Sequence, residues 1–71
     1  MPKLPRVSGA QATRALERLG FVRIRQSGSH VFMRRGQDSW VVPLHAELKL
    51  GTLAGLLRQA GIAAEEFVTG L

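Results

Sequence analysis

The chain has 71 residues, with ten lysines and arginines against five acidic residues, and therefore a net charge of +5. It contains no cysteine, which excludes disulfide bonds and thiolate metal sites. Its length fits one small domain over residues 1–71, and no apolar run approaches the roughly 18–20 residues of a membrane span. We expect a cytoplasmic protein that binds polyanions, nucleic acid first among them. Arginines that serve only solubility are the alternative interpretation of the charge.

The first part of the chain predicts an extended lead-in followed by a helix. Residues 1–7 contain two prolines and no periodic pattern. Ser8 and Gln11 form a Ser-x-x-Gln capping box, which predicts that a helix begins here. Gly20 predicts its end. The apolar residues at helical spacing between these points are Ala12, Ala15, Leu16 and Leu19.

Residues 21–26 and 30–34 alternate in the pattern of strands with one buried face. Residues 39–42 are expected to form a third strand. Residues 27–29 and 35–38 contain glycine and predict tight turns between them, and Pro43 predicts the end of the third strand.

Alternation also predicts which side chains share a face of the sheet. Val22 and Ile24 in the first strand are expected to point to the core, as are Val31 and Met33 in the second. The open face would then carry Arg23, Arg25, His30, Phe32 and Arg34. This arrangement depends on the strand register, because a shift of one residue exchanges the two faces.

The last third of the chain predicts a second helix over residues 50–60, closed by Gly61. Its apolar stripe consists of Leu50, Leu53, Leu57 and Ala60. Residues 62–71 predict a short helical turn in which Phe67 and Val68 pack against the core. The order of helix, three antiparallel strands and helix defines an α+β fold, with both helices on one face of the sheet.

Candidate chemistry centres on His30, which follows the turn residues Gly28 and Ser29. Histidine accepts and donates protons near neutral pH, and arginine binds phosphate through paired hydrogen bonds. RNA carries its own nucleophile, the ribose 2′-hydroxyl, which DNA lacks. A base and a cation therefore suffice to cleave RNA without a metal. The candidate RNA contacts are Arg23, Arg25, Ser29, Arg34 and Lys49.

The second catalytic group is left open by the sequence. His45 is a candidate to protonate the leaving oxygen, although a loop histidine is more often exposed to solvent or caps a helix. His30, His45 and Glu47 could supply three zinc ligands, but their spacing matches no recurrent zinc motif. We expect neither a metal nor another cofactor.

Short motifs follow one another along nearly the whole chain. They are Leu19-Gly20-Phe21, Arg25-Gln26-x-Gly28-Ser29-His30, Val42-Pro43-Leu44-His45, Gly51-Thr52-Leu53, Leu57-Arg58-Gln59-Ala60-Gly61-Ile62 and Glu65-Glu66-Phe67. In this order and spacing they resemble the HicA toxins, the small mRNA-cleaving components of HicA–HicB toxin–antitoxin pairs of bacteria and archaea.

The resemblance implies a fold like that of double-stranded-RNA-binding domains, α-β-β-β-α. It implies an endoribonuclease whose catalytic histidine belongs to the Gly-Ser-His motif, here His30. Gly28, which is free to adopt a positive φ, is expected to set the geometry of the loop before it. The resemblance also implies a HicB antitoxin that covers the active face. Recognition of A-form RNA by its shape is not expected, because Lys49 stands alone where true double-stranded-RNA-binding domains carry a lysine cluster. A non-catalytic RNA-binding module and a small protein-docking adaptor are the alternatives.

Overall fold

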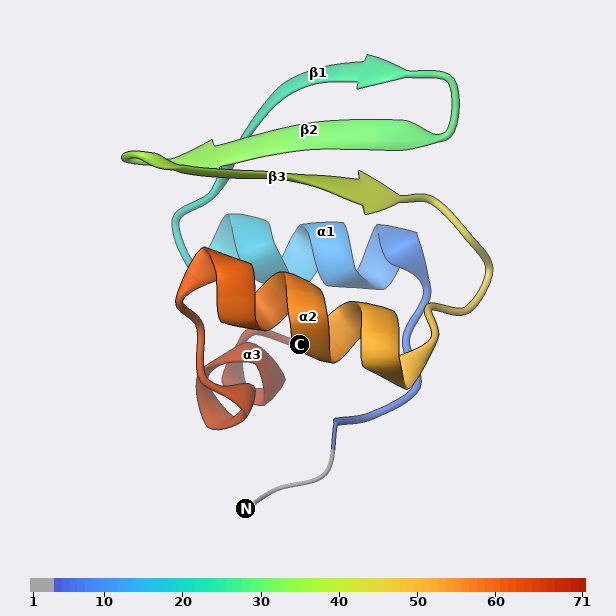
Figure 1. The fold of residues 1–71 in the computed structure, drawn as a ribbon, viewed down its shortest axis with the longest axis vertical. Helices are drawn as coiled ribbons and strands as arrows, with labels where there is room; N and C mark the ends of the chain where they lie inside the picture. Colours follow the sequence, from blue (N-terminus) through green and yellow to red (C-terminus); the bar gives the residue numbers. More distant parts are fainter. Residues whose placement is uncertain (1–3) are drawn as a thin grey trace.

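A computed structural model describes residues 4–71 (Figure 1), so residues 1–3 of the expected lead-in lie outside the described part. Its elements are α1 (Gly9–Arg18), β1 (Val22–Ser27), β2 (His30–Arg35), β3 (Asp38–Pro43), α2 (Leu50–Ala60) and α3 (Ala64–Gly70). The strands form one antiparallel sheet in the order β1-β2-β3. The predicted α+β fold, like that of double-stranded-RNA-binding domains, is confirmed, and the expected terminal turn is α3.

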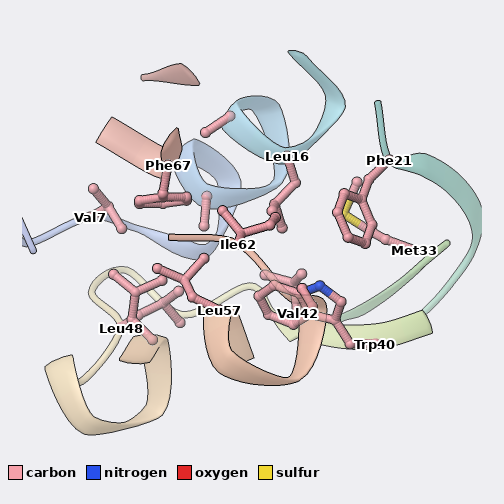
Figure 2. Packing of buried hydrophobic residues seen from close by; sticks show 14 of the residues in the cluster. Val7, Leu16, Phe21, Met33, Trp40, Val42, Leu48, Leu57, Ile62 and Phe67 are labelled. Carbon is pink, nitrogen blue, oxygen red and sulfur yellow. The ribbon is translucent and has the colours of Figure 1, made fainter. Parts of the chain in front are cut away.

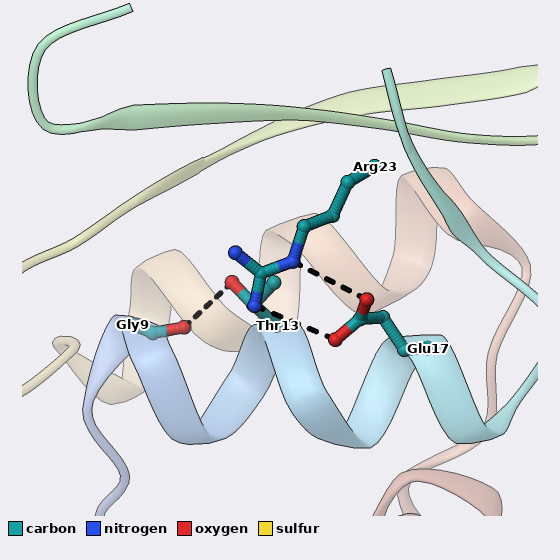
Figure 3. Close-up of polar contacts among 4 residues, drawn as sticks. All are labelled: Gly9, Thr13, Glu17 and Arg23. Atoms are coloured by element: carbon teal, nitrogen blue, oxygen red, sulfur yellow. Dashed lines mark hydrogen bonds and ion pairs between the residues drawn. The ribbon is translucent and has the colours of Figure 1, made fainter. Parts of the chain in front are cut away.

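α1 begins at the capping box that the sequence predicts. The Ser8 hydroxyl accepts a hydrogen bond from the Gln11 amide at 3.0 Å, and the Gln11 side-chain oxygen accepts one from the Ser8 amide at 2.8 Å. These bonds satisfy amide groups that have no partner within the first helical turn. Thr13, which is fully buried, is also satisfied because its hydroxyl donates to the Gly9 carbonyl at 2.8 Å (Figure 3).

The hydrophobic core lies between the helices and the inner face of the sheet (Figure 2). β2 and β3 contribute their alternate residues Val31, Met33, Trp40 and Val42, all buried. Phe21 meets the Trp40 ring edge to face, with the ring centroids 6.5 Å apart. Phe67 anchors α3 in the core, although no side chain caps the start of that helix.

The helices all lie on one side of the sheet (Figure 1). α1 and α2 form the layer next to it, and α3 packs against both of them from the far side. Arg18 of α1 donates to the Gly70 carbonyl of α3 at 2.7 Å, which fastens the end of the chain. The opposite face of the sheet is therefore left uncovered by residues 4–71.

Four apolar side chains expected to face the core are exposed instead. Val22 and Ile24 are 61% and 58% exposed. Both lie in the edge strand β1 (Figure 1), where Val22 pairs with Arg34 on the uncovered face and Ile24 falls at a shift of the register. Leu50 is exposed at the first residue of α2. Val68 is exposed because Phe67 and Gly70 already occupy the one side of α3 that meets the core.

Candidate nucleic-acid interface

The uncovered face of the sheet is built from alternate residues of its three strands. Residues paired across an antiparallel sheet point to the same face, so the register arranges these side chains in three rows. The rows are Ser27–His30–Pro43, Arg25–Phe32–Val41 and Val22–Arg34–Ser39. We call these residues the open face. It combines one imidazole, two guanidinium groups and several apolar side chains.

His30 is the first residue of β2, and its side chain is exposed. The preceding Gly28 has φ +58°, a conformation that strains residues with a Cβ atom. Two hydrogen bonds hold this turn: Leu44 N donates to the Ser29 carbonyl at 2.7 Å, and the Gln26 side-chain amide donates to the Gly28 carbonyl at 3.0 Å. The imidazole is thus presented to solvent from an anchored turn.

Arg25 lies in the row next to His30. Its guanidinium carbon is 4.3 Å from the centroid of the Phe32 ring, a cation–π contact that holds the planar group in place. Phe32 follows His30 by two residues, which corresponds to about 7 Å along a strand. No carboxylate of residues 4–71 forms an ion pair with Arg25. Its N–H groups can therefore serve a phosphate close to His30.

Arg34 is the third residue of β2 whose side chain lies on the open face, after His30 and Phe32. Its Nε donates to the Gly36 carbonyl at 2.9 Å, which orients the guanidinium and leaves four of its five N–H donors for other partners. As with Arg25, the described residues provide it with no ion pair. His30, Phe32 and Arg34 thus follow one another along a single strand.

Arg23 does not lie on the open face, contrary to the expectation from alternation. It pairs with Met33 on the helix side of the sheet. Its guanidinium reaches α1, where Nε lies 3.3 Å from Oε2 of Glu17 and Nη2 donates to Oε1 at 3.4 Å (Figure 3). The register shifts between Arg23 and Arg25, so Ile24 is the extra residue of a β-bulge. This bulge separates the two arginines.

The remaining candidates lie at the end of the sheet or among the helices. Ser29 belongs to the turn before His30. The carbonyl of His45 accepts a hydrogen bond from Gly9 N at 2.9 Å, so the backbone turns here from the sheet toward α1. Lys49 is the N-cap residue of α2, a helix of the layer that covers the other face of the sheet (Figure 1). The structure therefore does not bring Lys49 to the open face.

The structure does not group His30, His45 and Glu47 into a zinc site. Within residues 4–71, no three His, Cys, Asp or Glu side chains are grouped so that they could hold a metal ion. Glu47 lies instead 3.8 Å from Arg6 in an exposed ion pair.

The open face contains a hollow of about 370 Å³. Its lining includes Ile24, Arg25, Phe32, Arg34, Ser39 and Val41. The hollow thus lies beside the row that contains His30, and arginine, hydroxyl and apolar groups all reach it.

A comparison of the sequence with protein families found a match. The model described as HicA toxin of bacterial toxin–antitoxin matches residues 9–62, from the start of α1 to just beyond α2. The chain belongs to the HicA toxin family. Membership assigns it the toxin role in a toxin–antitoxin pair and implies an antitoxin partner. No curated protein matches the sequence significantly. Among residues 4–71 of this HicA-family toxin, no helix is long and apolar enough to cross a membrane.

Ile24, Ser39 and Val41 line the hollow of this HicA-family toxin, but the sequence analysis did not assign them to the site. Ser39 and Val41 alternate with the buried residues Trp40 and Val42, so the pattern of β3 contained the signal that would have placed them outward. Ile24 reaches the hollow through the bulge, for which the sequence offers no such signal.

Proposed function

We propose that this HicA-family toxin is an endoribonuclease that cleaves mRNA, with His30 as its general acid–base. The observation that carries the proposal is the exposed imidazole of His30 in line with Phe32 and Arg34 along β2, with Arg25 of the neighbouring strand stacked on Phe32. These groups supply proton transfer and phosphate contacts on a face that the helices leave open. Action on mRNA would take place in the cytoplasm.

The proposed reaction uses the 2′-hydroxyl of the substrate as nucleophile. His30 takes its proton, and the oxygen attacks the adjacent phosphorus while the bond to the 5′ oxygen of the next nucleotide breaks. That oxygen takes up a proton, so the products are a 2′,3′-cyclic phosphate and a 5′-hydroxyl. General acid–base catalysis supplies roughly 10²–10⁴-fold, and Arg25 and Arg34 would add electrostatic stabilisation of the phosphorane. No step requires a metal ion.

The group that protonates the leaving oxygen remains a prediction, with His45 as the candidate. A substrate in which sulfur replaces that oxygen tests it, because a thiolate departs without a proton. If His45 is the acid, His45→Ala slows cleavage of ordinary RNA and leaves the sulfur substrate unaffected. If His45→Ala slows cleavage of both substrates by the same factor, His45 is not the group that protonates the leaving oxygen.

The proposed partner is a HicB-like antitoxin that covers the open face. The net charge of +5 favours an acidic partner. Val22 and Ile24 are apolar and more than half exposed on or beside this face, as expected for a surface that a partner buries. Covering it would also remove His30 from contact with RNA.

Purified wild type and His30→Ala, incubated with a defined RNA in EDTA, test the proposal. The wild type is expected to produce cyclic phosphate ends, detected by mass spectrometry, and the variant to cleave at least about a hundredfold more slowly. An RNA with 2′-deoxyribose at the cleaved position is the matched control and should stay intact. Equal cleavage by both proteins would overturn the assignment of His30. Salt-sensitive binding without cleavage by either would indicate a non-catalytic RNA-binding module.

A further inference from the structure

The hollow on the open face has a chemical character that the proposed cleavage step does not use. Apolar walls come from Ile24, Phe32 and Val41, and polar groups from Arg25, Arg34 and Ser39. Its volume of about 370 Å³ lies at the small end of the range for small-molecule sites. Apolar walls beside several hydrogen-bond donors suit a flat heteroaromatic ring better than they suit a phosphate alone.

The hollow also lies at a defined distance from His30. Phe32, in the middle row of the open face, follows His30 by two residues of β2. Equivalent side chains on one face of a strand are about 7 Å apart, which is similar to the length of one nucleotide in an extended strand. An RNA with a phosphate at His30 can therefore place its neighbouring nucleotide over the hollow.

We propose that this hollow binds the nucleobase next to the cleaved phosphodiester and thereby sets the base preference of the toxin. The inference rests on the proposed function for the position of cleavage. Ile24 and Val41 contact the base, while Phe32, under the Arg25 guanidinium, gives the site a rigid wall. Stacking on aromatic and guanidinium groups is the common way in which proteins bind unpaired bases.

The charge of the residues that line the hollow favours single-stranded RNA over a second copy of the chain as its occupant. Arg25 and Arg34 have no carboxylate partner among residues 4–71, so a polyanion gains two charged contacts here. A second copy of the chain, placed face to face, would bring these arginines against one another, and opposed like charges destabilise a contact. Single-stranded RNA combines flat apolar bases with a charged backbone and matches both features.

Methyl NMR spectra of the His30→Ala protein test the base site without cleavage. Hexanucleotides of uridine, cytidine or adenosine are titrated beside an abasic ribose–phosphate chain of the same length. At least one RNA is expected to shift the methyl resonances of Ile24 and Val41 by the ring current of a base, whereas the abasic chain leaves them in place. The methyls of Val68 on α3 serve as the control. Equal shifts with the abasic chain, or shifts with an acidic partner protein alone, would overturn the proposal.

Cleavage by variants provides the second arm. Removing the base next to the cut is expected to slow the wild type by roughly 5- to 150-fold in kcat/KM, the range for one stacked base. Val41→Trp fills the hollow and should make cleavage insensitive to that base, while Val68→Trp behaves as wild type; melting curves check that both are folded. A wild type indifferent to the missing base would overturn the base site and leave the nuclease proposal intact. Methyl shifts on RNA binding, together with no cleavage by the wild type, would support the base site and overturn the nuclease proposal.

Discussion

Arg23 and Arg25 stand two residues apart in β1 but point to opposite faces of the sheet. Arg23 forms an ion pair with Glu17 of α1, whereas Arg25 lies over the ring of Phe32. The extra residue between them, Ile24, is what reverses the direction. One strand therefore uses one arginine to contact the helix layer and offers the other to a ligand, and the two side chains form a natural pair for comparison.

Replacing Arg25 with alanine is expected to weaken RNA binding in a salt-dependent way. Each lost phosphate contact with a single strand should reduce the slope of log K against log salt concentration by about 0.7. Binding of a labelled RNA to the His30→Ala protein, with and without Arg25→Ala, measures this slope at several salt concentrations.

Arg23→Ala removes the same charge from the other face and is the matched control. Its ion pair with Glu17 is partly exposed, so its loss should cost about 0–1 kcal/mol of stability and leave the salt slope unchanged. If both variants reduce the slope equally, overall charge and not position governs binding.

Gly28→Ala is expected to reduce both stability and cleavage. Its φ of +58° is left-handed, which costs a residue with a Cβ atom about 1–2 kcal/mol, and relief of that strain would move the turn that presents His30. Gly28→Asn should retain more of both properties, because asparagine adopts this conformation more readily. Urea unfolding and cleavage rates provide the comparison, and identical behaviour of the two variants would exclude φ as the cause.

Gly9→Ala is expected to destabilise the protein by about 1–3 kcal/mol. A Cβ atom here would collide with the Pro43 carbonyl and approach Leu44 Cα to 2.7 Å. α1 cannot move away without loss of the hydrogen bond from Gly9 N to the His45 carbonyl.

Gly55→Ala should change stability in the opposite direction from Gly9→Ala and serves as its control. Nothing lies within 4 Å of a Cβ at this position in α2, so alanine is expected to raise stability by about 0.5–1 kcal/mol. Urea unfolding measures both glycine variants. A neutral Gly9→Ala would show that the contact between α1 and the end of β3 can relax.

Ser8→Ala should cost about 1 kcal/mol of unfolding free energy, because it removes the hydroxyl that accepts from the Gln11 amide. Ser8→Asp should retain stability, since aspartate caps equally well and its charge suits a helix N-terminus. Thermal unfolding of the three proteins distinguishes loss of the cap from loss of the serine itself.

Elements defined by local interactions were predicted well. The capping box of Ser8 and Gln11 lies within one helical turn, and the helix expected over residues 50–60 matches α2. β2 alternates between buried and exposed residues as expected, because the helix layer covers one side of it. His30 was placed correctly on the exposed side for the same reason.

The side-chain directions of Val22, Arg23 and Ile24 in β1 were not predicted correctly from the sequence. Alternation assigned Val22 and Ile24 to the core, and a pattern of period two contains no sign of a bulge. It also contains no sign that the helices stop short of this strand, since that depends on packing between segments distant in sequence. Arg25 reaches the open face as expected, but only because the bulge compensates for the wrong starting direction.

The sequence by itself determined the order of the elements, their approximate ends and the turn that carries His30, because backbone conformation and capping act over a few neighbouring residues. Only the tertiary structure decided which arginine joins His30 and that Ile24, Ser39 and Val41 line a hollow beside it. Register, bulge and the extent of the helix layer set these relations. All three result from contacts between distant parts of the chain.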